Sequence, residues 1–191
     1  MILIIDMNYR KDSLGFHEFV SPIVSASKGL EECTIKHHHE LNPADIDKCS
    51  RVILSGNALK NKQALTRIDD FAWVKQCEKP ILGICAGMQT IGLIFGSSLT
   101  RCLEIGMVQI TTVKENQLFS SSFKAYELHS YSIRPSEELD ILAESEKCVQ
   151  AVKHKKKEIY GVLFHPEVRN REIIERFASL PSCQASLPRT L

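Results

Sequence analysis

The sequence predicts a three-layer α/β fold: a mainly parallel β-sheet with helices on both faces and a small antiparallel addition. Two observations favour this class. In the first half of the chain, short apolar runs typical of buried parallel strands alternate with segments of helical spacing. In the second half, short strand candidates follow one another, with turn-like stretches between them. We expect one domain over residues 1–180 and a flexible tail at 181–191.

The first half is predicted to contain four strands and two helices. Apolar residues recur at helical spacing from Leu65 to Ala72, and Pro80 follows this segment. A second helix is predicted over Gly87–Phe95, where Gly96 stops it. The four strands are short apolar runs: Met1–Asp6, Cys33–Lys36, Arg51–Ser55 and Ile81–Cys85.

The second half is predicted to contain six short strands and one helix. Asn170 is a candidate N-cap for the last helix, in which Ile173, Ile174 and Phe177 form one apolar face. The six strands are Gly106–Val113, Lys124–Glu127, Ser130–Ile133, Leu139–Glu144, Cys148–His154 and Ile159–Phe164. The basic run Lys153–Lys157 falls between the last two of these and is predicted to be a solvated hairpin tip.

Bulk properties exclude several classes of protein. The formal net charge is +1, so no overall field attracts nucleic acid or an anionic membrane. The seven cysteines are odd in number and include no C-x-x-C pair, so neither a disulfide framework nor a zinc site is expected. The uncharged segment Ile81–Leu99 is long enough to cross a bilayer, but its glycines and polar residues favour a buried strand followed by a buried helix. The start lacks a basic secretory region, and we expect a cytoplasmic protein.

The strongest local motif is Gly83-Ile84-Cys85-Ala86-Gly87, placed between a predicted strand and a predicted helix. This is the cysteine version of a nucleophile elbow, a tight turn that pushes the nucleophile into a cleft. The turn leaves no room for side chains two residues away, and Gly83 and Gly87 meet that demand. The N-terminus of the following helix favours a negative charge on the sulfur. A buried structural cysteine is the alternative interpretation.

A base for this nucleophile is predicted at Phe164-His165-Pro166-Glu167, which follows the strand Ile159–Phe164. The carboxyl ends of parallel strands gather at one edge of a sheet, so His165 can meet Cys85 there. Imidazole holds a thiol proton in the right pH range, and Glu167 can orient it. Either residue alone is more often structural or solvated, but the elbow and this segment together predict a triad of Cys85, His165 and Glu167.

These two segments, GICAGMQ (83–89) and GVLFHPEV (161–168), resemble the signatures of class I, or triad, glutamine amidotransferases. The resemblance implies a flavodoxin-like fold and a glutaminase that works through an acyl-enzyme. Cys85 would attack the side-chain amide of glutamine, ammonia would leave, and water would release glutamate. The family passes ammonia to a synthetase, so a separate synthetase subunit is the expected partner. No metal and no cofactor are expected.

The resemblance also implies residues that bind the substrate. The backbone N–H of Ala86 and the loop containing Gly56 and Asn57 would form the oxyanion hole. Gln89 occupies the family position that contacts glutamine. His129-Ser130-Tyr131 resembles the segment that binds the α-amino and carboxylate groups of the substrate.

Within the family, Ile141–Val168 resembles the stand-alone glutaminase subunit of archaeal-type two-subunit GMP synthase. Three segments depart from that pattern. Gly56-Asn57-Ala58 stands for Gly-Gly-Pro, Met7-Asn8-Tyr9-Arg10 for Asn-Gly-Gly-Gln, and His129-Ser130-Tyr131 for His-x-Asp. The glutaminase of imidazole glycerol phosphate synthase also has Gly-Met-Gln after its cysteine and a His-Ser-Tyr segment. Other open alternatives are a free-standing γ-glutamyl hydrolase or peptidase and an inactive regulatory module.

His37-His38-His39 is the one histidine run. Consecutive residues of a strand point to alternate faces, so the three rings are not expected to converge on a metal ion. The sequence therefore predicts a loop or an exposed face here.

Overall fold

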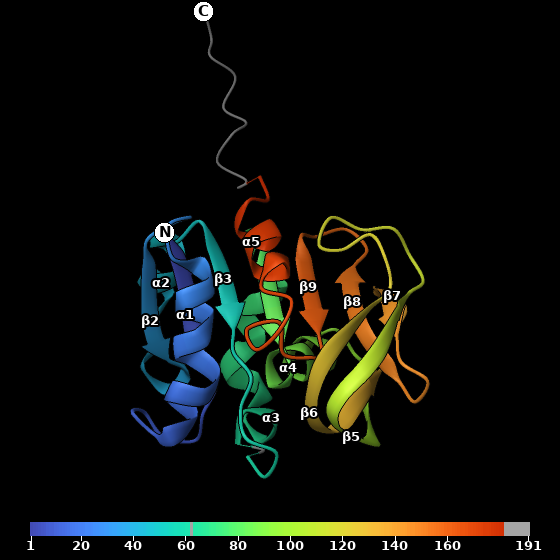
Figure 1. Ribbon diagram of the computed structural model, residues 1–191. Coiled ribbons are helices and arrows are strands. Elements are labelled where there is room, and N and C mark those ends of the chain that lie inside the picture. The colour runs from blue at the N-terminus through green and yellow to red at the C-terminus, as the bar shows by residue number, and fades with distance from the viewer. Residues whose placement is uncertain (62, 182–191) are drawn as a thin grey trace, which may run out of the picture.

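A computed structural model describes residues 1–61 and 63–181 (Figure 1). Its centre is a nine-stranded sheet with the order β2-β1-β3-β4-β9-β8-β7-β5-β6. The strands are β1 (Ile2–Asp6), β2 (Cys33–His37), β3 (Arg51–Leu54), β4 (Ile81–Ile84), β5 (Ser98–Thr112), β6 (Phe123–Arg134), β7 (Leu139–Glu144), β8 (Val149–His154) and β9 (Ile159–Val162). The predicted tail at 181–191 lies, apart from its first residue, outside the described residues.

The strands β2, β1, β3, β4 and β9 are parallel to one another. Their carboxyl ends therefore share one edge of the sheet, and both predicted signature segments begin there. The strand β9 is the last in the chain, yet it lies in the middle of the sheet between β4 and β8. This arrangement brings the segment after β9 next to the segment after β4.

Helices cover both faces of the parallel strands, which confirms the predicted three layers (Figure 1). Alternate residues of β1 face opposite cores: Ile4 packs with residues of α1 and α5, and Leu3 packs with residues of η3 and α4. The helices are η1 (Phe16–Val20), α1 (Ser21–Ser27), η2 (His38–Glu40), α2 (Pro43–Lys48), α3 (Gln63–Thr66), η3 (Ile68–Lys75), α4 (Ala86–Ile94) and α5 (Glu172–Ala178). The predicted helix around Leu65–Ala72 is thus a short α-helix followed by a 3-10 helix.

The antiparallel addition consists of β5 to β8. It differs from the predicted strands in two ways. The strand predicted at Gly106–Val113 begins eight residues earlier, at Ser98, and the two strands predicted at Lys124–Glu127 and Ser130–Ile133 are the single strand β6. The strand continues because His129, a polar residue by type, is buried and keeps the alternation of buried and half-buried positions. The basic run between β8 and β9 does form a hairpin turn.

Two further sequence predictions concern single segments. Asn170 is not the N-cap of α5: it has φ of 74°, and Arg171 occupies the N-cap position without a side-chain bond. Asparagine tolerates this left-handed conformation better than most residues do, so it ends the preceding turn instead. The uncharged segment Ile81–Leu99 forms β4, α4 and the start of β5. Within the described part of the chain, no helix combines the length and apolarity that crossing a membrane requires.

Candidate functional site

The turn from β4 to α4 has the strained backbone expected of a nucleophile elbow. Cys85 sits there with φ of 49° and ψ of −102°, outside the regions that non-glycine residues favour. A Cβ atom on Gly83 would lie 2.5 Å from the carbonyl carbon of Gly87, and one on Gly87 would lie 2.5 Å from the carbonyl oxygen of Leu54. Glycine is therefore required at both positions, because the nearest atoms that a Cβ would meet belong to the backbone and cannot move aside as a side chain can.

We expect Gly87→Ala to destabilise the fold by about 1–3 kcal/mol, because the new methyl group overlaps the backbone of β3. Gly92→Ala, in the same helix, is the matched control. Its Cβ would meet only the side chain of Ile133, and alanine favours a helix by about 1 kcal/mol over glycine. Urea unfolding of the two variants checks this. Equal midpoints for both variants would mean that the elbow is not tightly packed.

The side chains of His165 and Glu167 meet directly after β9. Nδ1 of His165 lies 2.7 Å from a carboxylate oxygen of Glu167, and both side chains are almost completely buried. The backbone N–H of His165 donates to the carbonyl of Tyr126 on β6. One edge of the ring packs against Gly56, where a Cβ would lie 2.7 Å from Cε1, and Phe19 contacts the ring as well. The imidazole is therefore held in one position by three elements of the fold.

Charge at this site favours a protonated histidine. Complete burial alone would lower the pKa of His165, but the negative charges of Glu167 and Cys85 outweigh it and raise that pKa well above its usual value. The second ring nitrogen, Nε2, is buried and has no nitrogen or oxygen partner among the described residues. The backbone N–H of Cys85 donates to the carbonyl of Val162, which fixes the nucleophile beside the strand that precedes the histidine. An imidazolium next to a thiolate is the arrangement that attack on a carbonyl carbon requires.

The loop after β3 lies against the same site. The hydroxyl of Ser55 accepts from the N–H of Met7 and donates to the carbonyl of Gly56. The side-chain amide of Asn57 donates to the carbonyl of Met7. The peptide between Gly56 and Asn57 is therefore held in one orientation. Ala86 begins α4, where the first N–H groups of a helix have no partner within the helix.

The candidate catalytic cleft, which lies at Cys85, is narrow. Its free volume is about 20 Å³, room for roughly one water molecule. Six residues predicted for the nucleophile, the oxyanion hole and glutamine binding line it: Asn57, Cys85, Gln89, His129, Ser130 and Tyr131. Leu59 and Leu65 complete its wall. A ligand larger than a water molecule therefore enters only when this wall moves outward.

The side chains of the predicted substrate residues differ in how they face the cleft. The amide of Gln89 donates to the carbonyl of Tyr131, which joins α4 to β6 across the cleft. The imidazole of His129 is fully buried and lies 3.2 Å from the carboxylates of both Glu104 and Glu127. It thus points into the protein behind β6. Burial raises the pKa of Glu127, although His129 opposes that shift.

The sequence did not reveal this buried cluster of Glu104, Glu127 and His129. Of the three residues only Glu127 lies in a predicted strand, and an acidic residue in a strand is usually solvated. The cluster forms because a β-bulge between Arg101 and Glu104 shifts the pairing of β5 with β6.

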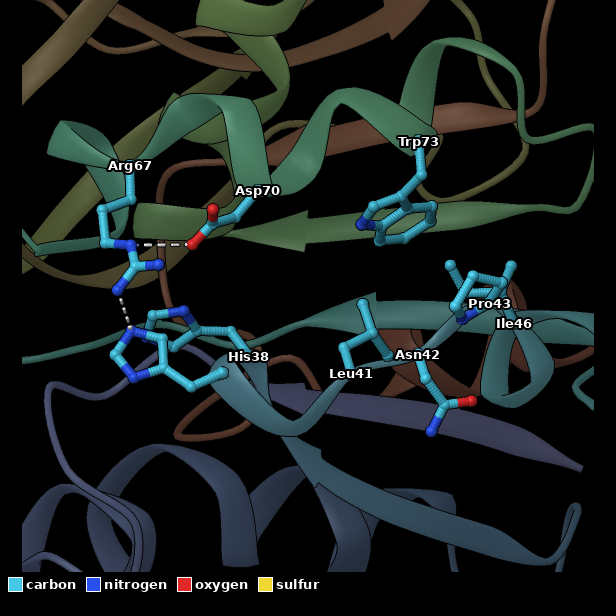
Figure 2. Close-up of a pocket in the computed structure, with 9 residues that line it drawn as sticks. His38, Leu41, Asn42, Pro43, Ile46, Arg67, Asp70 and Trp73 are labelled. Atoms are coloured by element: carbon cyan, nitrogen blue, oxygen red, sulfur yellow. Dashed lines mark hydrogen bonds and ion pairs between the residues drawn. The ribbon is translucent and has the colours of Figure 1, made fainter.

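A larger groove lies elsewhere. It measures about 620 Å³ and separates η3 from η2 and α2 (Figure 2). Trp73 lies over Pro43 and Ile46 at one end, and Arg67 bridges Asp70 and His39 at the other. The groove shares no lining residue with the catalytic cleft and contains no candidate nucleophile, so we do not assign catalysis to it.

The histidine run beside this groove corrects one expectation. The rings of His37, His38 and His39 do converge, with centroids 4.0–5.1 Å apart. The strand β2 ends at His37 and the chain turns into a 3-10 helix, so the alternation of strand faces no longer applies. Burial and the two neighbouring rings lower the pKa of His38 to about 4. Nε2 of His37 lies 2.9 Å from the carbonyl oxygen of Asn8, so it is engaged as a donor.

Comparison with known proteins gives a consistent result. The family model described as glutamine amidotransferase class-I matches residues 17–178. The glutamine-hydrolysing GMP synthase subunit of Methanococcus maripaludis strain C7 is 35% identical over 167 residues, which cover 84% of this chain and 81% of the relative. The corresponding protein of Pyrococcus abyssi is 32% identical over 168 residues, covering 80% and 86%. A crystal structure from Thermoplasma acidophilum, of a protein assigned to the same GMP synthase subunit, has a TM-score of 0.81 at 24% identity, covering 93% and 91%, and so shares the fold.

Proposed function

We propose a function from one premise: this chain belongs to the class I glutamine amidotransferase family. It hydrolyses glutamine and serves as the glutaminase subunit of a two-subunit GMP synthase. The observation that carries the chemistry is the meeting of the Cys85 elbow with the buried pair of His165 and Glu167. The names of the two relatives support the assignment to GMP synthase.

The proposed reaction has two halves. The thiolate of Cys85 attacks the side-chain amide carbon of glutamine, and the imidazolium of His165 gives its proton to the leaving nitrogen, so ammonia departs and a γ-glutamyl thioester remains. A water molecule then attacks the thioester, with neutral His165 accepting its proton. The C–S bond breaks, glutamate leaves, and the proton returns the site to its starting state. N–H groups of Ala86 and Asn57 stabilise the oxyanion of each tetrahedral intermediate.

We also propose roles for the residues that line the cleft and for a partner that receives the ammonia. Gln89, Ser130 and Tyr131 hold the substrate glutamine, and His129 supports the backbone of that segment from behind. A separate synthetase subunit receives the ammonia. The chain needs no cofactor for these steps, because both halves of the reaction use only its own side chains and water.

The function is tested by supplying glutamine as the sole nitrogen source to the purified chain mixed with a synthetase subunit of the GMP synthase class and that subunit's own nucleotide substrates. GMP should form, with one glutamate released for each GMP. Glutamate release without GMP formation would support the proposed glutaminase activity and contradict the proposed GMP synthase partner. Preference for γ-glutamyl peptides over glutamine would instead indicate a free-standing hydrolase.

We expect Glu167→Gln to lower turnover by about a hundredfold or more, which is ~2.7 kcal/mol of barrier or more. The amide keeps the size of the carboxylate but loses the negative charge that stabilises the imidazolium of His165. The fold should survive, as circular dichroism can check. Glu172→Gln, on the exposed first turn of α5, is the matched control and should keep full activity. Undiminished turnover in Glu167→Gln would reduce the triad to a Cys–His dyad.

A further inference from the structure

A second group of ligand-type side chains lies behind the catalytic cleft, where β5, β6 and the turn before β8 meet. The Sγ atoms of Cys102 and Cys148 and a carboxylate oxygen of Glu104 all lie within 4.8 Å of one another. The Glu104 oxygen Oε2 is 3.3 Å from Sγ of Cys148 and 3.2 Å from Nε2 of His129. The carboxylate is buried, and the two thiols are half-buried. The proposed glutaminase reaction uses none of these three side chains.

The tautomer of His129 is fixed by its surroundings. Nδ1 lies 3.1 Å from the carbonyl oxygen of Cys102, and a carbonyl oxygen only accepts, so Nδ1 carries a proton. The other nitrogen, Nε2, is buried and has no hydrogen-bond partner within the described chain, although it lies 3.2 Å from oxygens of both Glu104 and Glu127. Nε2 of His129 thus faces oxygens of two buried carboxylates. A cation at this point is attracted to both oxygens.

Two carboxylates at this cluster are almost completely buried. Glu104 is 3% exposed and Glu127 is 0% exposed. In residues 1–61 and 63–181, neither carboxylate forms an ion pair with a lysine or an arginine. Buried carboxylates are normally paired with a positive group or bound to a metal ion, because leaving water costs an isolated charge many kcal/mol.

We propose that Cys102, Cys148 and Glu104 form a site for one zinc ion, with the ring of His129 beside it. Two sulfurs and one carboxylate oxygen are ligands that Zn²⁺ accepts, and a water molecule can complete the tetrahedron. Bond lengths of about 2.0–2.3 Å place tetrahedral ligand atoms roughly 3.4–3.8 Å apart, and the three protein ligand atoms lie within 4.8 Å of one another. The N–H of His129 on the carbonyl of Cys102, and the amide of Gln150 on Glu104, orient the ligands as outer partners do in zinc sites.

No spacing motif announces this site, because Cys102 and Cys148 lie far apart in the sequence and come from β5 and from the turn before β8. The ion would tie that turn to the bulge of β5, directly behind the segment of β6 that lines the cleft. Binding consumes no oxidant: two thiols release their protons as the zinc–sulfur bonds form.

The test uses the purified full chain, reduced, freed of metal with a chelator and titrated with Co²⁺ in the absence of oxygen. One equivalent should bind, with the sulfur-to-cobalt charge-transfer absorption and the intense visible bands of a four-coordinate thiolate site, and Zn²⁺ should displace it. Cys102→Ser and Cys148→Ser should each weaken binding by about a hundredfold or more, beyond the effect of losing an outer partner. Zn²⁺ should raise the unfolding temperature of the parent chain and not that of the double variant.

Three controls locate the ion. Cys77→Ser, in another buried part of the chain, and Cys85→Ser, at the nucleophile, should bind Co²⁺ like the parent. So should His38→Ala, beside the converging histidines. Glu104→Gln keeps the shape of the side chain and should weaken binding, which covers the case of a cysteine variant that fails to fold. The proposal is overturned if the parent takes up no stoichiometric metal, in which case a proton satisfies His129, or if Cys85→Ser or His38→Ala abolishes uptake.

Discussion

Replacing Cys85 with alanine is expected to abolish glutamine hydrolysis, lowering turnover by about a millionfold, or ~8 kcal/mol of barrier, as loss of the nucleophile does in other acyl-transfer triads. The structure supplies the reason. Cys85 alone among the described cysteines has the elbow conformation and the His165 imidazole beside it. A glutamine-like electrophile should label Cys85 in the parent chain and no residue in the variant, as peptide mass spectrometry can establish.

The other cysteines provide an internal control for this labelling. Burial raises the pKa of the Cys49 and Cys77 thiols, so they hold little thiolate at neutral pH and should react slowly. Cys77→Ala should keep both activity and labelling. Activity that survives in Cys85→Ala, or label that falls mainly on another cysteine, would place the nucleophile elsewhere.

The second large effect is expected from the synthetase partner, which should raise glutamine hydrolysis by about a hundredfold to a thousandfold, the usual contribution of one oxyanion donor. Two features are expected to keep the isolated chain slow. The cleft has room for about one water molecule, and the peptide between Gly56 and Asn57 is held by the Ser55 hydroxyl and by the Asn57 amide. A partner that binds the form with an open cleft and with the Asn57 N–H turned toward the oxyanion shifts the population of the chain toward that form. Steady-state hydrolysis, titrated with the synthetase, measures the effect.

Asn57→Gly separates the loop from the rest of this activation. Glycine adopts positive φ freely and removes the bond to Met7, so the basal rate should rise and the stimulation should shrink. Ala58→Gly adds the same freedom one residue later and leaves the Asn57 amide in place, so it should change little. Fast hydrolysis by the parent chain alone, unaffected by a partner, would contradict both expectations and favour a free-standing hydrolase.

The sequence predicted what local patterns encode. The five residues Gly83–Gly87 predict a strand, a tight turn and a helix around Cys85. The four residues Phe164–Glu167 predict the segment of His165 after a strand. The placement of both segments at the ends of β4 and β9 could therefore be expected. The helices α1 and α2 were not predicted, because neither shows a clear apolar face: α1 buries only two apolar residues, Ile23 and Ala26, and α2 buries none. The predicted elements that place the site residues correctly are strands whose hydrophobic pattern extends over their whole length.

The buried polar groups escaped prediction for a different reason. Glu104, Glu127 and His129 come together through the register of β5 against β6, and a single bulge sets that register. No pattern within either segment reports which residue of one strand faces which residue of the other. The convergence of His37, His38 and His39 was missed because it depends on the residue at which β2 ends.

The position of β9 in the sheet affects the order in which the protein folds during synthesis. A growing chain emerges amino end first, so β1 to β4 and the β5–β8 region are synthesised before the strand that lies between them. Until β9 arrives, β4 presents an open edge of unpaired backbone groups, a template for association with other chains. Closing the sheet then requires a pairing between strands distant in sequence, the kind of contact that slows folding. During this interval Cys85 lacks its proposed base, His165, so the proposed chemistry becomes available only when the final strand has been inserted.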